Sequence, residues 1–300
     1  MNTQSYLMGL IGQGVTPSLT PPMQEQEGAA QGLRFVYRPI DLDTLKLPPT
    51  DVGRLLSSGV ELGFNAFNIT HPCKQLVLDA LDAIDPAAQR LGACNTVLND
   101  AGRLVGYNTD RSGFASALAR ELPDANLDDV VLLGAGGAGS AVADALLSAG
   151  VARLSVLDPE PARAQALVEQ LRANAPERTA PQLRSGSPEQ AQSWLPNATG
   201  VVNASPIGMF THPGIPCDPA LLRPEHWVAD IVYRPARTEL IETASALGCA
   251  VMPGQAMAVG QAADTFELVT GRTPDRSRMQ KHLESLIAAE QLAGQLKEHA

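Results

Sequence analysis

Residues 130–149 read VVLLGAGGAGSAVADALLSA, and this stretch decides the fold of the central part of the chain. Residues 130–133 are a short, wholly apolar run, which is typical of a buried strand in a parallel sheet. The next residues, 134–139, fit the pattern G-x-G-x-x-G, and the Ala-rich segment 140–149 has the composition of a helix. A second apolar run at 154–157 ends at Asp158. This order of strand, glycine-rich turn, helix, strand and acidic residue predicts a dinucleotide-binding unit.

Each part of this unit has a physical role in holding a dinucleotide. Gly134 permits the tight turn, Gly136 lets the pyrophosphate approach the backbone, and Gly139 lets the helix pack closely on the strand. The N–H groups and the dipole at the start of the helix favour the phosphate charge. We therefore predict that the residues of the turn hold the cofactor: Gly134, Ala135, Gly136, Gly137, Ala138 and Gly139.

Asp158 and Arg163 decide which nicotinamide cofactor the unit is expected to take. A carboxylate at the end of the second strand accepts hydrogen bonds from the adenosine ribose and repels a 2′-phosphate, so Asp158 favours NAD over NADP. Asp158 could instead form a turn before Pro159, and Arg163 could accept a 2′-phosphate or stack on the adenine. Because a carboxylate at the hydroxyl position conflicts directly with a phosphate dianion, we expect NAD to be the cofactor.

The composition describes an acidic globular protein of 300 residues. Hydrophobic residues make up 44% of the chain, charged residues 18%, and the formal net charge is −10. This balance suits one large or two ordinary domains, and the lack of a Lys/Arg cluster argues against a nucleic-acid partner. No apolar run approaches the roughly 20 residues of a membrane span, and the first residues do not resemble a signal peptide. We therefore expect no membrane partner and a cytoplasmic location.

The residue types that bind metals are spaced unfavourably for a metal site. The cysteines, Cys73, Cys94, Cys217 and Cys249, form no CxxC pair, and the histidines have no HxxxH spacing. We expect no metal, and thiols kept in a reducing compartment.

Apolar runs and helical patterns alternate along the chain and predict an α/β fold. In the first part, strands are expected at 6–11, 33–40, 64–69, 94–98 and 103–107, and helices at 51–62 and 72–81. Beyond this part, strands are expected at 130–133, 154–157, 200–204, 228–232 and 250–252. Helices are expected at 114–122, 140–149, 161–174, 238–247, 255–270 and 276–297. Residues 176–197 are rich in Pro, Ser and Gln and are expected to be irregular, with at most one strand.

A charged residue near a predicted helix start, Lys74, is the best candidate for the proton transfer that accompanies hydride transfer from an alcohol. In the sequence NITHPCK, which ends at Lys74, Thr70 is expected to cap a helix that begins at Pro72, so that Lys74 lies in its first turn. The sequence NTD, which ends at Asp110, also precedes a helical pattern. Taken alone, Lys74 could equally be a solvated surface residue, and Asp110 an ordinary helix cap.

Ordered motifs along nearly the whole chain resemble the shikimate dehydrogenase family, and most closely its NAD-dependent quinate/shikimate dehydrogenase branch. Besides the glycine-rich turn, they are SLTP at 18–21, FNITHPCK at 67–74, GACNTV at 92–97, GYNTD at 106–110, VNASPIGM at 202–209, WVADIVY at 227–233, GQAM at 254–257 and QAADTF at 261–266. The resemblance implies a two-domain α/β fold. An N-terminal substrate domain would span 1–110 and be completed by a C-terminal helix over 265–300, and a Rossmann-type NAD-binding domain would span 111–264.

The resemblance also implies roles for single residues. Lys74 and Asp110 match the family's catalytic pair, in which the lysine relays the proton of the reacting hydroxyl and the aspartate orients the lysine. Ser18 and Thr20 match the hydroxyls that hold the substrate carboxylate. The remaining implied substrate contacts are Thr70, Asn95, Tyr233 and Gln261, and the nicotinamide side is implied to be lined by Asn203, Ala204, Val232, Gly254 and Met257.

Two departures separate the chain from the commonest biosynthetic members of the family. Those members carry Ser-x-Ser near the N-terminus and a basic, NADP-selecting stretch after the second nucleotide-domain strand, where this chain has Thr20 and Asp158. We therefore expect NAD-dependent oxidation of quinate, shikimate or both to the 3-dehydro acid, by a monomer or homodimer. The alternatives are an NADP-type biosynthetic shikimate dehydrogenase, an aminoshikimate dehydrogenase, and a nucleotide-sensing protein without turnover.

Overall fold

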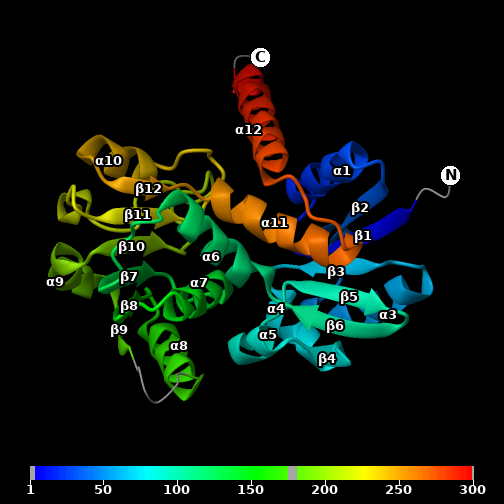
Figure 1. Ribbon diagram of the computed structural model, residues 1–300, viewed down its shortest axis with the longest axis horizontal. Helices are drawn as coiled ribbons and strands as arrows, with labels where there is room; N and C mark the ends of the chain where they lie inside the picture. Colours follow the sequence, from blue (N-terminus) through cyan, green and yellow to red (C-terminus); the bar gives the residue numbers. More distant parts are fainter. Residues whose placement is uncertain (1–3, 175–180, 299–300) are drawn as a thin grey trace. The chain divides into compact units, whose positions relative to one another are not determined.

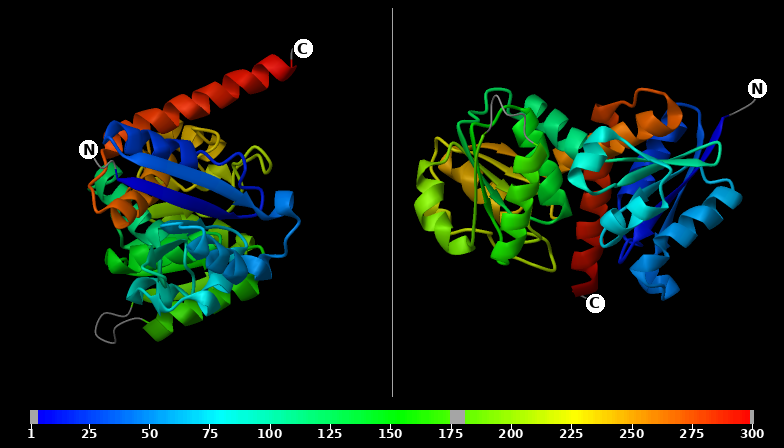
Figure 2. Two further views of the ribbon diagram at one scale, coloured as in Figure 1. Left: turned by 90° about the vertical axis from the view of Figure 1, so that its right-hand side faces the viewer. Right: turned by 90° about the horizontal axis from the view of Figure 1, so that it is seen from below.

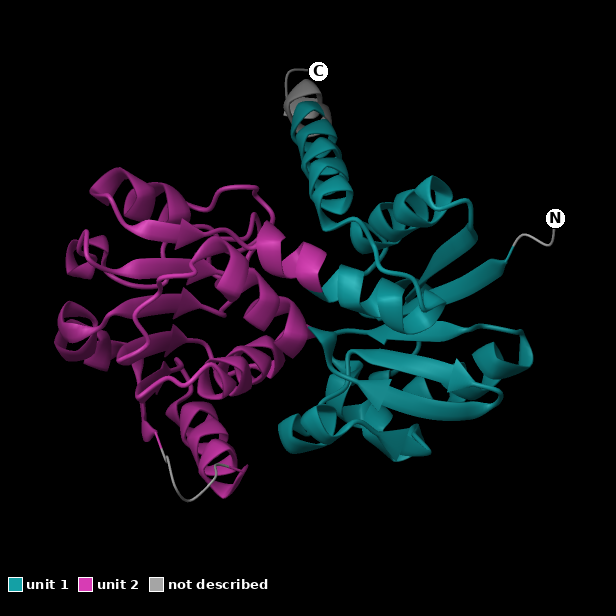
Figure 3. Ribbon diagram, in the orientation of Figure 1, with its two compact units in different colours: residues 1–109, 261–300 teal, residues 110–260 magenta. Residues whose placement is uncertain are grey.

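The computed structural model describes residues 4–174 and 181–298 and forms two compact units (Figure 1). The first unit is Met1–Thr109 with Gln261–Ala300, and the second is Asp110–Gly260 (Figure 3). The sequence analysis placed the corresponding boundaries at 110/111 and 264/265. The chain passes between the units inside two helices, α6 (Thr109–Glu121) and α11 (Gln255–Thr270).

The second unit is an open, wholly parallel sheet of the doubly wound type. In the order β12-β11-β10-β7-β8-β9, its strands are β12 (Ala250–Met252), β11 (Trp227–Asp230), β10 (Gly200–Asn203), β7 (Asp129–Leu133), β8 (Arg153–Leu157) and β9 (Gln182–Gly186). If β7 is counted as strand 1 and the later strands as 2 to 6, the order read from β9 is 3-2-1-4-5-6, which is the strand order of dinucleotide-binding sheets. The order reverses between β7 and β10, and ligands of such sheets bind outside the carboxyl ends of the strands at that point.

Apolar side chains cover both faces of this sheet. Along β7, Val130 and Leu132 belong to one hydrophobic cluster, whereas Val131 and Leu133 belong to another on the opposite face. This arrangement explains why the strand is wholly apolar rather than alternating. The covering helices, besides parts of α6 and α11, are α7 (Gly137–Ser148), α8 (Pro161–Asn174), α9 (Ala191–Trp194) and α10 (Glu239–Leu247).

The first unit is built on a mixed sheet with the strand order β2-β1-β3-β5-β6-β4. The strands are β1 (Ser5–Gly12), β2 (Arg34–Asp41), β3 (Ala66–Ile69), β4 (Ala83–Ile84), β5 (Thr96–Asp100) and β6 (Arg103–Tyr107), and β1 and β2 lie side by side in parallel (Figure 2). The helices of this unit include α1 (Thr20–Ala30), α2 (Leu42–Leu45), α3 (Val52–Glu61), α4 (Cys73–Leu76), α5 (Pro86–Leu91) and α12 (Arg276–Glu298). The buried Glu27 of α1 forms a two-bond ion pair with Arg278 of α12, with both N···O distances at 2.8 Å.

Strand β2 forms one edge of this sheet. The N–H of Arg34 points toward β1, where it donates to the carbonyl of Gln4 at 3.1 Å, so residues of odd number direct their N–H groups outward. The outward N–H of Tyr37 donates to the side chain of Glu25 at 2.8 Å. Pro39, two residues further on, has no N–H.

Several elements differ from the sequence expectation. Helices α1, α2 and α5 and strand β4 were not predicted, and α6 begins at Thr109 rather than at 114. The helix expected over 72–81 is two short pieces, α4 and the 3-10 turn Val77–Ala80. The strand expected within 176–197 is β9, and residues 176–180 of that segment lie outside the described residues.

Candidate active site

The glycine-rich turn joins β7 to α7 at the carboxyl edge of the parallel sheet. Gly134 has a φ of +108°, and a Cβ atom there would lie 2.8 Å from the peptide that joins Ala204 to Ser205. A Cβ atom on Gly139 would lie 2.2 Å from the carbonyl oxygen of Gly134. A Cβ atom on Gly136 would have no protein atom within 4 Å. Gly134 and Gly139 are therefore required by the turn itself, whereas Gly136 has the open side that an approaching phosphate needs.

The start of α7 suits an anion. The cap residue of the helix is Gly136, and no side chain forms a capping hydrogen bond there. Its amino end therefore offers backbone N–H groups and the positive end of the helix dipole to a phosphate. Ala135, in the turn, instead donates its N–H to Asp158.

Asp158 lies at the end of β8 and is tied to the turn. Its Oδ2 accepts the N–H of Ala135 at 2.8 Å, its Oδ1 accepts the N–H of Glu160 at 2.9 Å, and the residue is only 8% exposed. The guanidinium of Arg163 pairs with Glu160 at 2.8 Å, and both of those side chains are exposed. Asp158 and Glu160 thus bring two carboxylates to this end of the strand, against the single guanidinium of Arg163 that pairs with Glu160.

The residues predicted for the nicotinamide side gather at the same edge of the second unit. Asn203 ends β10 and Ala204 follows it, in contact distance of Gly134. Val232 lies two residues beyond β11, and a Cβ atom on Gly254 would lie 2.4 Å from its carbonyl oxygen. Met257, in α11, belongs to the same hydrophobic cluster as Ala204.

Asp230, which the sequence analysis did not single out, is the most buried acid at this edge. It is fully buried, and its carboxylate accepts hydrogen bonds from Asn203 Nδ2 at 2.9 Å, the N–H of Val232 at 2.9 Å and Thr238 Oγ1 at 2.6 Å. Burial raises the pKa of Asp230 to about 6, against the lowering effect of these hydrogen bonds. The available sequence signal was a single acid in the otherwise apolar run WVADIV.

In the first unit, Asp41 anchors the loop that leads to Ser18 and Thr20. Its carboxylate accepts the N–H groups of Gly14 at 3.0 Å and Thr16 at 2.9 Å, and the Thr16 hydroxyl at 2.7 Å. Burial by itself raises the pKa of Asp41, but the hydrogen bonds outweigh it and hold the pKa below its ordinary value of 3.8. The N–H of Thr20 donates to Ser18 Oγ at 3.4 Å, so the two predicted residues are neighbours at the start of α1.

Lys74 lies in α4, and the prediction that Thr70 caps this helix is wrong. The cap residue is Pro72, with no side-chain hydrogen bond. The backbone carbonyl of Thr70 instead accepts the N–H of Cys73 at 2.8 Å. Because this backbone hydrogen bond closes the turn before α4, the Thr70 hydroxyl does not cap the helix. The carbonyl of Lys74 accepts the N–H of Cys94 at 2.8 Å. The backbone of Lys74 is therefore tied to the residue before Asn95.

Asn95 is fixed to the residue that precedes Asp110. Its Nδ2 donates to Thr109 Oγ1 at 3.0 Å, and its Oδ1 accepts the N–H of Thr109 at 2.7 Å. The hydroxyls of Thr96, Thr109 and Thr265 form a buried triangle with sides of 3.1 to 3.3 Å, which the sequence analysis also missed. Since α6 begins at Thr109, Asp110 lies inside its first turn rather than at its cap position.

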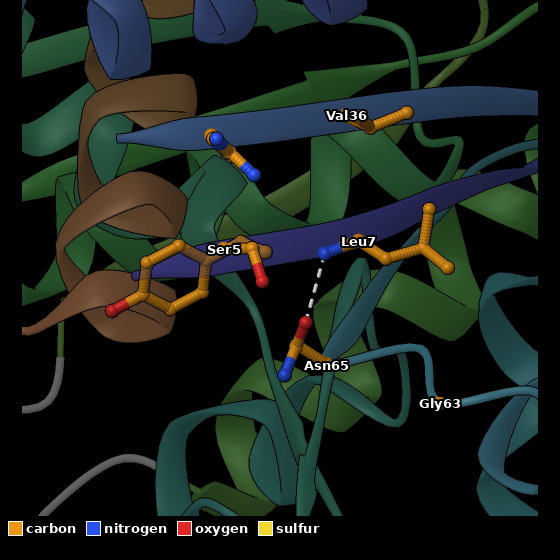
Figure 4. A pocket seen from close by; sticks show the side chains of 7 residues that line it. Ser5, Leu7, Val36, Gly63 and Asn65 are labelled. Atoms are coloured by element: carbon orange, nitrogen blue, oxygen red, sulfur yellow. Dashed lines mark hydrogen bonds between the residues drawn. The ribbon is translucent and has the colours of Figure 1, made fainter. Parts of the chain in front are cut away.

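The structure thus groups the predicted residues within each unit. The first unit holds Ser18, Thr20, Thr70, Lys74, Asn95 and Gln261, and the second holds Asp110, Tyr233 and all the predicted cofactor residues. A shallow hollow in the first unit is lined by residues that include Ser5, Val36 and Asn65, whose Oδ1 accepts the N–H of Leu7 at 2.8 Å (Figure 4). It contains none of the predicted residues, and only Arg34 among its lining residues is charged.

No group of three His, Cys, Asp or Glu side chains within 4–174 and 181–298 could hold a metal ion. In the same ranges, no helix has the length and apolar character needed to cross a membrane.

Known proteins resemble this chain along nearly its whole length. Residues 10–97 match the family described as the shikimate dehydrogenase substrate binding domain. A shikimate dehydrogenase (NADP(+)) of Pseudarthrobacter chlorophenolicus is 56% identical over 97% of this chain and 98% of its own. A quinate/shikimate dehydrogenase (NAD(+)) of Corynebacterium glutamicum is 48% identical over 94% of this chain and 99% of its own. The solved quinate dehydrogenase from C. glutamicum in complex with NAD has a TM-score of 0.89 at 47% identity, and the match covers 94% of this chain and all of that one.

The doubly wound sheet and its glycine-rich turn are of the Rossmann type, and together with the dehydrogenases that the chain matches they define an oxidoreductase that uses a nicotinamide cofactor. The chain belongs to the shikimate dehydrogenase family. The names of its relatives divide between NAD and NADP, and between shikimate alone and quinate with shikimate.

Proposed function

We propose that this chain oxidises quinate and shikimate to the 3-dehydro acids with NAD as the hydride acceptor. The observation that carries the choice of cofactor is the carboxylate of Asp158, buried at the end of β8 and bonded to the N–H of Ala135 in the turn. A ribose with free hydroxyls can donate to such a carboxylate, whereas a 2′-phosphate would be repelled by it. Arg163 pairs with the exposed Glu160, which offsets part of its charge.

In the proposed reaction, the alcohol loses a hydride to one acceptor and a proton to another. The nicotinamide, when bound, takes the hydride from the carbon that bears the hydroxyl. Lys74, as the free amine, accepts the hydroxyl proton and passes it to solvent, and Asp110 orients Lys74 and offsets its charge. As an ammonium, Lys74 also stabilises negative charge on the oxygen.

Ser18 and Thr20 are proposed to hold the substrate carboxylate. The two residues are joined by a hydrogen bond from the N–H of Thr20 to Ser18 Oγ, and the Asp41 anchor fixes the loop that precedes them. Quinate carries an extra hydroxyl on the carbon that bears the carboxylate, and we propose that the Thr20 hydroxyl bonds it. Small hydroxyl groups tolerate both ring shapes better than a planar, two-bond Arg clamp would, which supports turnover of both acids.

The second candidate function is that of an NADP-type shikimate dehydrogenase. It is favoured by three relatives named for NADP, which at 52–56% identity are more similar to this chain than the three named for NAD, at 46–48%.

Initial rates with quinate, shikimate and aminoshikimate, each with NAD⁺ and with NADP⁺, decide between these functions. We expect turnover of quinate and shikimate with NAD⁺. Equal or faster rates with NADP⁺ would establish the second candidate. Turnover of aminoshikimate alone would contradict both, and binding of NADH without turnover of any acid would indicate a nucleotide sensor.

A further inference from the structure

We infer that Asp230 is a positioning residue that holds the protein's nicotinamide-side segments in place. Asp230 is the last residue of β11, and its register partner Asn203 is the last residue of β10. The hydrogen bond from the N–H of Ile231 to the carbonyl of Asn203, at 3.0 Å, closes the ladder between the two strands. Segments beyond this point have left the sheet, so the strand pairing no longer holds them.

The carboxylate of Asp230 continues the connection where the ladder stops. Its Oδ1 accepts both Asn203 Nδ2 and the N–H of Val232, each at 2.9 Å, and its Oδ2 accepts Thr238 Oγ1 at 2.6 Å. One buried group therefore joins the end of β10, the loop after β11 and the start of α10. An ionised carboxylate offers acceptors only, which matches three donors.

Asn203 carries this connection into the loop that follows it. Its Nδ2 also donates to the carbonyl of Ile207 at 2.9 Å, and its Oδ1 accepts the N–H of Ser205 at 3.0 Å and the Ser205 hydroxyl at 2.7 Å. Asn203 is fully buried, so these bonds define a single arrangement of the loop.

Two glycines pack directly on the segments that Asp230 holds. The space beside Gly134 is filled by the peptide of Ala204 and Ser205, so the glycine-rich turn rests on the Asn203 loop. The space beside Gly254 is filled by the carbonyl of Val232, at 2.4 Å from an added Cβ atom. A shift of either segment would therefore displace the turn or the residues at the start of α11.

This inference rests on the proposed placement of the nicotinamide, so its test uses the dinucleotide alone. NADH is titrated, by its own fluorescence, into the full-length wild type, Asp230→Ala and Asp230→Asn. We expect Asp230→Ala to raise the Kd by about tenfold or more, because it leaves buried donors without their acceptor. Asp230→Asn keeps an oxygen for Asn203 and Val232, and the Thr238 hydroxyl can turn to accept from the new amide, so its Kd should stay within about threefold.

The matched control is Asp129→Ala. Asp129 is also buried, in the same parallel sheet, and it pairs with Arg153 at 2.8 Å, but it begins β7 and so lies at the opposite, amino edge. We expect this variant to lose thermal stability and keep the wild-type Kd. If Asp230→Ala does not fold, Thr238→Val, which removes one donor, should raise the Kd about threefold.

Three results would overturn the inference. The first is a Kd within twofold of wild type for a folded Asp230→Ala or, if that variant does not fold, for Thr238→Val. The second is an equal loss of NADH affinity in Asp129→Ala. The third is a Kd for Asp230→Asn as weak as that for Asp230→Ala. If the wild type prefers NADPH, the proposed cofactor is wrong. The same ratios of variant to wild type, measured with NADPH, then test Asp230 independently.

Discussion

Replacing Asp158 with serine tests the cofactor choice most directly. The Asp158 carboxylate accepts two backbone N–H groups and is 8% exposed, so its charge is fixed in place beside the turn. Serine removes the charge and keeps one oxygen that can accept from Ala135. The substitution therefore changes the electrostatics more than the shape of the turn.

The size of the effect follows from Coulomb's law. Two unit charges about 5 Å apart repel by about 1 kcal/mol in water and about 3 kcal/mol at an effective dielectric constant near 20. Because Asp158 is nearly buried, the repulsion lies toward the upper value, and about 1.4 kcal/mol already corresponds to a factor of ten. We expect the wild type to prefer NAD over NADP by at least about tenfold in kcat/KM, and Asp158→Ser to reduce this ratio about tenfold.

The assay is kcat/KM for each cofactor at saturating shikimate. Expressing the result as a ratio cancels changes common to both cofactors, such as partial loosening of the turn. Glu169→Gln is the matched control, since this exposed carboxylate lies further along α8, away from the start of the helix, and should change the ratio less than about threefold. Arg163→Ala should leave NADP use unchanged. A wild type that uses NADP equally well, or an unchanged ratio in Asp158→Ser, would refute the reasoning.

Three further predictions concern proton transfer, substrate choice and stability. Lys74→Ala should lower kcat by roughly a hundredfold or more while the Kd for NADH stays constant; near-normal kcat would exclude Lys74 from the mechanism. Thr20→Val should lower kcat/KM for quinate more than for shikimate, and an equal loss would count against the proposed bond to the extra hydroxyl. Glu27→Gln should reduce the free energy of unfolding in urea by about 1–3 kcal/mol at pH 7, because it breaks the charged pair with Arg278. Burial alone raises the pKa of Glu27, but its bonds to Arg278 lower the pKa below 4.5. The difference in free energy of unfolding between wild type and Glu27→Gln should therefore shrink as the pH falls below 4.5. A difference that does not depend on pH would contradict this.

The sequence was informative where the physical cause is local. Residues close together in the chain determine the strand β7, the conformation of the glycine-rich turn and the helix α8. The structure confirms all three. Helix α1 was missed because its first turn contains two prolines and its buried face includes Gln24 and Glu27, so the segment reads as polar. Proline is acceptable at the first helical positions, but this says little about where a helix continues.

The anchoring acids could not be found from local pattern. Asp41 accepts from residues 25 and 27 positions earlier, and Asp230 accepts from Asn203, 27 positions earlier. Both acids also accept from donors nearby in the chain, but their bonds to these distant residues depend on sheet pairing and have no spacing signature. The threonine triangle is similar, because Thr265 reaches Thr96 from 169 positions away.

The edge of β2 affects how the molecule behaves in a crowded solution. An exposed strand edge with free N–H groups is a template on which a second chain can add a strand and begin an aggregate. Here the Tyr37 N–H is already satisfied by Glu25, and Pro39 has none to offer. An added strand would lose two successive donors along this edge. Glu25 and Pro39 therefore protect against edge-to-edge self-assembly, and replacing both, by Glu25→Ala and Pro39→Val, should increase light scattering on concentration without altering turnover.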